Sequence, residues 1–256
     1  MGSEPRSVPQ RERQVTVLAV PVDGWNVDEL VATAITWGSA REARTILYAN
    51  VHVLNTAHEQ PLLRRALQQA DTVYCDGSGA RLGALLMGGR LPVRMTGADW
   101  IEDFCAAACR SGTRVFLLAG DHGVAARAAE ILAQRYSGLQ IVGTHHGYLD
   151  DASTTASALE AIESAQPHVV FVGMGTPRQE LWVQQHRAHI GRRVVWCVGA
   201  LFDFVAGTQR RGPRWLVDHH MEWLARLLSD PRRLWKRYLV GNTLFLIRVA
   251  RQRIVS

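Results

Sequence analysis

The chain has 256 residues, of which 47% are hydrophobic and 20% charged, and its formal net charge is +6. This length and composition suit one large α/β domain or two small lobes with buried cores, so the chain should fold alone. No run of about 18 apolar residues occurs, which excludes a helix that spans a bilayer.

The amino-terminal segment and the cysteines indicate the cellular compartment in which the protein is expected. The first 14 residues have no apolar stretch of the kind a secretory signal carries, and we expect residues 1–14 to form a disordered tail. The four cysteines form neither a CxxC pair nor a cluster with histidines. This pattern favours reduced, buried thiols in a cytosolic protein over a metal site.

From residue 15 to residue 208, short β-branched runs alternate with longer helical patterns, which predicts an α/β fold with a mainly parallel sheet. We expect Rossmann-like lobes, about 15–113 and 114–208. The expected strands are 15–22, 44–50, 71–76, 114–120, 139–145, 168–175 and 193–204. The expected helices include 60–70, 98–112, 123–136 and 178–190, and a further helix begins near Gly77.

Polar residues or glycines follow most of the expected strands, where parallel sheets bind their ligands. In the segment ADTVYCDGSG, Asp76 ends an apolar strand before a glycine-rich turn. A carboxylate in that position can act as a general base. The alternative, which the residues alone favour, is an Asx-type cap on the following helix.

Two glycine-bearing turns are candidate nucleotide sites. Gly120 and Gly123 would let backbone N–H groups at a helix N-terminus approach a phosphate, although a turn that needs a positive φ gives the same pattern. After Gly175, Gln179 and Glu180 could hydrogen-bond a ribose or base, although a glutamate near a helix start also suits the helix dipole. The glycines from residue 77 onward are spaced one residue too far apart for the dinucleotide fingerprint.

The carboxyl-terminal region is strongly basic. Residues 209–256 contain eleven basic and three acidic residues, a net charge of +8, whereas the rest carries −2. Tryptophans among these arginines suit an anionic membrane surface, or nucleic acid bound through phosphates and stacking. No nucleic-acid-binding motif accompanies them. We therefore expect a basic helical appendage, 209–256, that docks on a membrane.

Six sequence blocks together resemble a known family. In chain order they are YANVHV, ADTVYCDGSG, LPVRMTGADW, VFVGMGTPRQELW, VGALFDFVAGTQRRGPRWL and MEWLARLLSDPRRLWKRYL. They resemble the WecG/TagA/CpsF family of bacterial glycosyltransferases over about residues 15–245. The resemblance implies an inverting, metal-independent enzyme that moves a sugar from a UDP-sugar to a polyprenyl-diphosphate-linked acceptor. It would work in the cytoplasm, peripherally bound to the inner face of the plasma membrane, in cell-surface polysaccharide or glycolipid assembly. The donor sugar could be of the N-acetylmannosamine, uronic acid or glucose type, and the oligomeric state stays open.

The resemblance also implies roles for individual residues. Asp76 matches the proposed base, and the other expected catalytic residues are Asn50, Arg94 and Asp99, although a buried structural Arg94–Asp99 pair is an equal alternative. Tyr48 stands where many members have threonine. The residues expected to bind UDP are Gly77, Gly120, Gly123, Gly175, Gln179, Glu180, Gly199, Phe202, Asp203, Arg226, Arg233, Lys236 and Arg237. The chain has no D-x-D pair for Mg²⁺, so arginines and helix N-termini would offset the charge of the departing UDP.

Two other functions remain open at this point. A nucleotide-cofactor enzyme, such as an oxidoreductase or sugar epimerase, would use the same sheet edge. It would need a G-x-G-x-x-G turn and a Tyr-x-x-x-Lys pair, but the only lysine in the chain is Lys236. A noncatalytic basic binding module would leave the polar strand ends unexplained.

Overall fold

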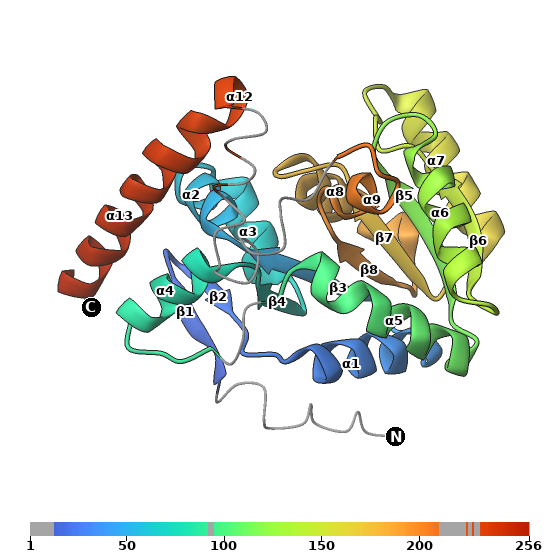
Figure 1. Cartoon of the computed structure of the whole chain (residues 1–256), viewed down its shortest axis with the longest axis horizontal. Helices are drawn as coiled ribbons and strands as arrows, with labels where there is room; N and C mark the ends of the chain where they lie inside the picture. The colour runs from blue at the N-terminus through green and yellow to red at the C-terminus, as the bar shows by residue number, and fades with distance from the viewer. Residues whose placement is uncertain (1–12, 92–94, 210–223, 225–226, 228–230, 256) are drawn as a thin grey trace.

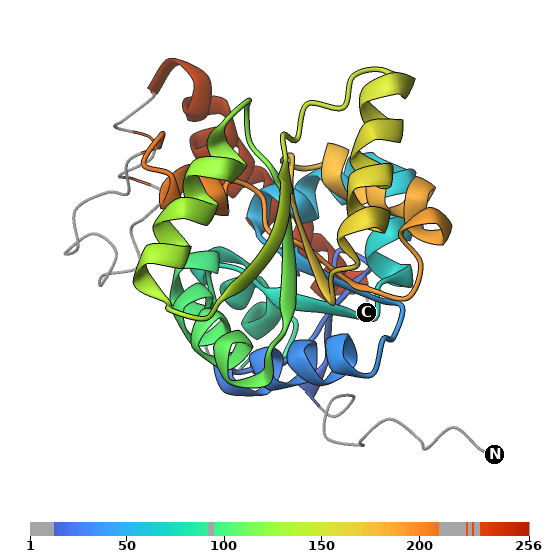
Figure 2. The same ribbon diagram turned by 90° about the vertical axis from the view of Figure 1, so that its right-hand side faces the viewer.

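The structure is a computed structural model that describes residues 13–91, 95–209, 224, 227 and 231–255. It has the predicted α/β fold, with one six-stranded parallel sheet between two layers of helices (Figures 1 and 2). Residues 1–12 of the expected tail lie outside the described residues. Across the sheet the strands follow the order β4 (Thr72–Cys75), β3 (Arg44–Ala49), β8 (Val194–Cys197), β7 (Val169–Gly173), β5 (Arg114–Ala119) and β6 (Gln140–His145).

The helices pack on both faces of this sheet, as expected for parallel strands joined by crossover helices. Helices α1, α5 and α6 cover one face, and α3, α7 and α8 cover the other (Figure 2). In chain order the helices before the carboxyl-terminal region are α1 (Val27–Ser39), α2 (Val51–Glu59), α3 (Pro61–Gln69), α4 (Ser78–Leu86), α5 (Gly97–Ser111), α6 (Val124–Arg135), α7 (Ala152–Ala165), α8 (Arg178–Ile190) and α9 (Leu201–Val205).

Strands from both expected lobes share the sheet. β3 and β4 come from the first lobe, the other four strands come from the second, and β3 pairs with β8 where the two groups meet. Under this junction Trp196 of β8 stacks on Trp100 of α5, with ring centroids 4.1 Å apart. Both tryptophans are fully buried, so the start of α5 is held firmly beneath the carboxyl ends of the central strands.

The prediction of a single strand at residues 15–22 is wrong. This segment forms an antiparallel hairpin of β1 (Val15–Val17) and β2 (Val20–Val22), in which Val17 pairs with Val20. The two linking residues, Leu18 and Ala19, have φ values of 50° and 64°. Two consecutive positive φ values match the tight hairpin turns that suit twisted strands, and neither residue is a glycine or asparagine that would have signalled the turn.

The last expected strand, 193–204, is also too long. β8 ends at Cys197, and Gly199 has a φ of 57°, which ends the extended backbone before α9 begins. The amide of Gly199 donates to Oε1 of Gln179 at 3.0 Å rather than to a neighbouring strand. The apolar residues after it therefore form a short helix at the sheet edge.

Beyond residue 230 the described part of the expected basic appendage is helical, in α12 (Pro231–Trp235), the π-helical turn η2 (Lys236–Val240) and α13 (Gly241–Val255). Residues 210–223, 225, 226, 228–230 and 256 of the expected appendage lie outside the described residues. Part of this region belongs to the core: Phe245 and Val249 are fully buried, and the Phe245 ring lies so close to Gly83 of α4 that a side chain there would collide with it. Asn55 of α2 accepts from Arg248 at 3.0 Å and donates to the Gly241 carbonyl at 2.8 Å. α13 is thus fixed to the elements that build the sheet edge.

Within the described residues, no helix is long and apolar enough to cross a membrane.

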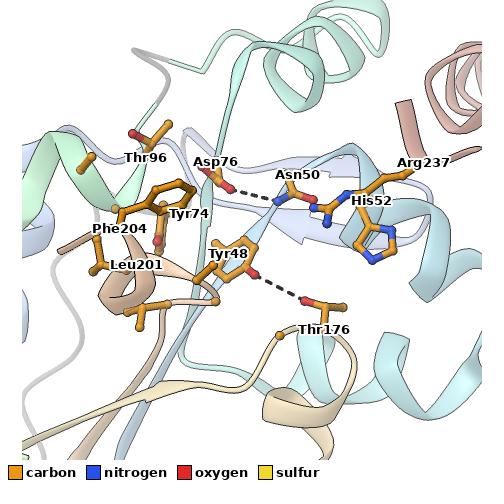
Figure 3. A pocket seen from close by; sticks show the side chains of 16 residues that line it. Tyr48, Asn50, His52, Tyr74, Asp76, Thr96, Thr176, Leu201, Phe204 and Arg237 are labelled. Atoms are coloured by element: carbon orange, nitrogen blue, oxygen red, sulfur yellow. Dashed lines mark hydrogen bonds between the residues drawn. The ribbon is translucent and has the colours of Figure 1, made fainter. Parts of the chain in front are cut away.

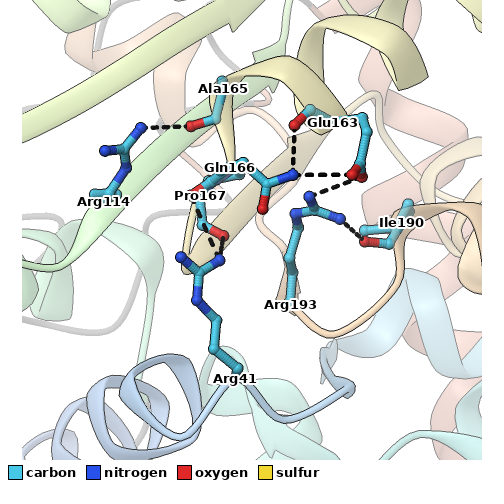
Figure 4. A network of polar contacts seen from close by, with 8 residues as sticks. All are labelled: Arg41, Arg114, Glu163, Ala165, Gln166, Pro167, Ile190 and Arg193. Carbon is cyan, nitrogen blue, oxygen red and sulfur yellow. Dashed lines mark hydrogen bonds and ion pairs between the residues drawn. The ribbon is translucent and has the colours of Figure 1, made fainter.

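Several arginines at the amino ends of the strands are structural (Figure 4). Arg193 pairs with Glu163 at 2.8 Å, and Arg114 donates to the Ala165 carbonyl at 2.8 Å. Arg41 donates to the Pro167 carbonyl at 3.1 Å. The contacts of Arg114 and Arg41 satisfy carbonyls at and just beyond the end of α7, and all three arginines place positive charge near its negative pole, at the opposite edge of the sheet from the carboxyl ends of the strands.

Candidate active site

A pocket lies over the carboxyl ends of β3, β4, β7 and β8, the edge where the sequence predicts a ligand (Figure 3). The start of α5, helix α9 and the turn η2 complete its walls. The pocket is lined by Tyr48, Asn50, His52, Tyr74, Asp76, Thr96, Gly97, Ala98, Gly175, Thr176, Val198, Gly199, Ala200, Leu201, Phe204 and Arg237.

Asp76 and Asn50 meet in this pocket because they follow neighbouring parallel strands. The side-chain amide of Asn50 donates to Oδ2 of Asp76 at 3.0 Å. Its Oδ1 accepts from the backbone N–H of Val53 at 3.0 Å and so caps α2. Since the backbone donor fixes which end of the amide is the oxygen, the amide nitrogen must face the carboxylate.

Asp76 is not the residue that caps α4. The N-cap is Gly77, which has a φ of 87° and no side-chain cap hydrogen bond. Apart from its neighbours Asp76 and Ser78, no described residue has an atom within 4 Å of the position that a Cβ at Gly77 would occupy. The glycine therefore supplies the turn and leaves open space beside Asp76.

Gln179 and Glu180 lie inside the pocket wall rather than on its surface. Both are buried, and the Gln179 amide donates to Oε1 of Glu180 at 2.7 Å and to the Tyr48 hydroxyl at 3.3 Å. Thr176, which does line the pocket, donates to the same Glu180 oxygen at 2.9 Å. Burial raises the pKa of the Glu180 carboxyl and of the Tyr48 hydroxyl. The structure thus shows these side chains joining β3, α8 and the β8 turn; contact with a ribose stays a prediction.

The predicted glycines divide into two groups. Gly175 and Gly199 line the pocket, both with positive φ, and space is open beside Gly175. Gly120 and Gly123 lie at the end of β5 and the N-cap of α6, with φ values of 64° and 82°, outside the pocket lining. Asp203 of α9 is near this second group: burial, and then the charge of Asp121, raise the pKa of its carboxyl.

Phe202 is a core residue, not a pocket residue. It is fully buried and its ring packs against Phe171 of β7 at 5.7 Å. Phe204, two positions later in α9, lines the pocket instead. Two residues along a helix turn the side chain to nearly the opposite side, so the apolar segment alone did not show which phenylalanine faces the ligand space.

The expected cations lie in different places. Arg237 lines the pocket, whereas the neighbouring Lys236 is exposed and its Nζ lies 5.6 Å from the centroid of the Trp235 ring. Arg94 and Arg226 lie outside the described residues, and the placement of the Arg233 side chain is not described either.

Asp99 acts at the start of α5. Its Oδ2 accepts from the backbone N–H and the hydroxyl of Thr96, both at 2.8 Å, which forms a capping box. Thr96 lines the pocket, so Asp99 helps to position that wall.

His52 was not predicted from the sequence. It lies in the first turn of α2, two residues after the cap Asn50, and lines the pocket. Burial, and then the positive charge of Arg237, lower the pKa of His52 to about 4, so its imidazole is neutral near pH 7. Its position two residues after Asn50 was the only sequence signal for placing His52 near the pocket. The proximity of Arg237 of η2 could not be predicted from that spacing.

No three histidine, cysteine, aspartate or glutamate side chains in the described part of the chain are grouped so that they could hold a metal ion. The pocket's own ionisable side chains are Tyr48, His52, Tyr74, Asp76 and Arg237. Such a set can accept a proton at a carboxylate and bind an anion at a guanidinium.

Comparison with known proteins gives consistent matches. The model of the glycosyl transferase WecG/TagA/CpsF family matches residues 15–256. An N-acetylglucosaminyldiphosphoundecaprenol N-acetyl-β-D-mannosaminyltransferase of Bacillus spizizenii is 30% identical over 194 residues, which cover 76% of this chain and 74% of the relative. The enzyme of the same name from Staphylococcus aureus is 28% identical over 242 residues, 93% of this chain and 92% of the relative.

Proposed function

The chain belongs to the WecG/TagA/CpsF family of glycosyltransferases, and from this premise we propose that it moves a sugar from a UDP-sugar to a polyprenyl-diphosphate-linked acceptor. The names of the relatives support an N-acetylmannosamine-type donor and an N-acetylglucosamine-bearing acceptor lipid. The observation that carries the proposal is the Asn50–Asp76 pair at 3.0 Å, in a pocket that Arg237 also lines.

In the proposed reaction, a hydroxyl oxygen of the acceptor attacks the anomeric carbon of the donor sugar. The bond from that carbon to the UDP oxygen breaks, and UDP leaves with the bonding electron pair. Asp76 takes the hydroxyl proton, while Asn50 holds the carboxylate in its ionised form. Attack opposite the leaving group inverts the anomeric configuration.

The leaving UDP requires positive potential, which we assign to Arg237 and to backbone N–H groups at glycine turns rather than to a metal ion. Open space beside Gly175 and Gly123 supports a diphosphate path along the strand ends. Asp203, near Gly120 and Gly123, is a candidate for contact with the ribose or base.

A ligand-binding comparison tests the donor class. A ligand that binds only the native state raises the apparent stability by RT ln(1 + [L]/Kd). We expect UDP-sugars to raise the melting temperature and NAD(P) at the same concentration to leave it unchanged. Stabilisation by NAD(P) alone, with no effect of any uridine nucleotide, would refute the proposed donor.

We also propose that the outer side of the carboxyl-terminal helices meets an anionic membrane. Residues 231–255 carry seven basic and no acidic residues. Away from the buried Phe245 and Val249, α13 exposes apolar side chains next to basic ones such as Arg251 and Arg253. The exposed apolar residues of this surface are Leu239, Val240, Leu246, Ile247 and Ile254, and nearby α4 adds Leu82, Leu85 and Leu86. Peripheral membrane proteins bind in this way: apolar side chains insert into the bilayer interface, and neighbouring arginines bind anionic lipid headgroups.

Replacing Leu246 and Ile247 together by serine should weaken binding to vesicles that contain anionic lipid at least tenfold. Each side chain is more than 40% exposed, and full burial of one such side chain contributes about 1.5–3 kcal/mol. Sedimentation with vesicles measures the effect, and Leu62→Ser on α3, where Leu62 is 63% exposed, is the matched control. Equal loss of binding in both variants, or in neither, would contradict the assignment of this surface.

A further inference from the structure

Two nitrogen-bearing side chains meet at the junction between the core and the carboxyl-terminal helices. His52 enters the pocket from the first turn of α2, and Arg237 enters from the π-helical turn η2 (Figure 3). The guanidinium of Arg237 points toward Asn50 and His52 in this view. π-helical turns frequently occur at functional sites, and in this one Arg237 lines the pocket whereas Lys236 is exposed.

The surroundings of this pair favour an anion. Nε of Arg237 is buried and has no hydrogen-bond partner within the described part of the chain. The nearby carboxylates have partners of their own: Asp76 accepts from Asn50 at 3.0 Å, and Glu59 pairs with Arg248 at 2.6 Å. The pocket therefore brings together a guanidinium and an imidazole, and among the described residues no ion pair joins either of them to an acid.

The charge on His52 depends on its neighbours. Arg237 of η2 disfavours the imidazolium and Glu59 of α2 favours it, while Asp76 and Tyr48 line the same pocket from the strand ends. Without a ligand the imidazole is neutral near pH 7, because burial and Arg237 together outweigh Glu59. A bound anion with two negative charges would reverse that balance and raise the pKa of His52.

We propose that His52 and Arg237 form a subsite for a diphosphate group, and that His52 takes up a proton when the diphosphate binds. The inference rests on the proposed function, in which both substrates carry a diphosphate. The bound diphosphate could belong to the UDP-sugar or to the lipid-linked acceptor, so the binding of each ligand must be measured separately.

The sign of the pH dependence follows from linkage. Protonated His52 attracts the anion, so the diphosphate should raise the pKa of His52 above its value of about 4 in the free protein. Between these two pKa values, diphosphate binding should strengthen as the pH falls. The slope is at most tenfold per pH unit for one proton. Both diphosphates are diesters and lack the terminal phosphate ionisation near pH 6, so the ligands do not titrate in this range.

The experiment is calorimetric titration of the full chain with a UDP-sugar, and separately with a short-chain polyprenyl-diphosphate-linked N-acetylglucosamine, from about pH 6 to about pH 8. Buffers of different ionisation enthalpy report the protons taken up. We expect proton uptake with one of the two ligands, which identifies the source of the diphosphate. His52→Gln should remove the uptake and weaken binding of that ligand at pH 6. His58→Gln changes an exposed histidine at the other end of α2 and should behave as the wild type does.

The possible outcomes separate this inference from the proposed function. If neither ligand is bound by the wild type with uptake of a proton, the subsite is overturned, even if the chain transfers sugar. Uptake that persists in His52→Gln would overturn it as well. Proton-linked binding in a chain that transfers no sugar would support the subsite and overturn the proposed function. Failure of both ligands to bind would overturn both.

Discussion

Asp76→Asn should lower kcat by about 10²–10⁴ while leaving the fold and UDP binding intact, since that is the usual contribution of general-base assistance. The amide has the shape of the carboxylate but cannot take the proton from the acceptor hydroxyl. Its oxygen can still accept from the Asn50 amide, which approaches Asp76 at 3.0 Å, so the pocket should keep its geometry. Steady-state turnover at saturating donor and acceptor measures the loss.

The matched control is Asp103→Asn, the same chemical change at an exposed carboxylate of α5. It should turn over at the wild-type rate. Turnover of Asp76→Asn within about threefold of wild type would mean that another group takes the proton, because a missing general base costs far more than that.

The second large effect is expected at Arg237. Hydrogen bonds to charged groups contribute about 1.5–3 kcal/mol, so Arg237→Gln should lower kcat/KM by about 10- to 150-fold. The measurement should use a soluble acceptor analogue, because removing one positive charge also weakens membrane binding by about 1 kcal/mol.

Lys236→Gln provides the control for Arg237. It removes the same charge one residue away, but Lys236 is exposed and its Nζ lies over the Trp235 ring. On the soluble analogue it should keep nearly full activity, while both variants should bind anionic vesicles more weakly. Equal losses of activity in the two variants would show a general electrostatic effect instead of a contact in the pocket.

The features that local sequence patterns determine could be predicted. The alternation of β-branched runs and helical patterns located the six strands of the main sheet, because parallel strands buried on both faces are nearly continuous apolar runs. It also placed Asp76 and Asn50 at the same sheet edge, since each directly follows a strand of that sheet. Their approach to 3.0 Å then depends only on β3 and β4 being neighbours.

The features that depend on distant contacts could not be predicted. Two consecutive positive φ values at Leu18 and Ala19 turn one apolar run into a hairpin, without a glycine to mark the turn. The register of α9 places Phe204 in the pocket and Phe202 in the core. In the same way the register of η2 places Arg237 rather than Lys236 in the pocket, and burial, followed by the charge of Arg237, lowers the pKa of His52.

The buried pair Gln179 and Glu180 shows a different difficulty. Polar side chains at the start of a helix that follows a strand often contact ligands in parallel sheets. The sequence position of Gln179 and Glu180 therefore predicts that they hydrogen-bond a nucleotide. In the folded chain Gln179 and Glu180 hydrogen-bond to each other and to Tyr48, Thr176 and Gly199. A buried polar group needs partners, and here the protein supplies them for every polar side-chain atom of the pair except Oε2 of Glu180, which has none within the described residues.

The central claim, inverting transfer from a UDP-sugar without a metal ion, is tested most directly by the anomeric configuration of the product. An α-linked UDP-N-acetylmannosamine and a polyprenyl-diphosphate-linked N-acetylglucosamine would be incubated with the full chain in excess EDTA, and the new linkage read by NMR. We predict a β-linked disaccharide lipid, formed as fast in EDTA as in a parallel reaction with Mg²⁺. An α-linked product, or product only when Mg²⁺ is added, would contradict the mechanism.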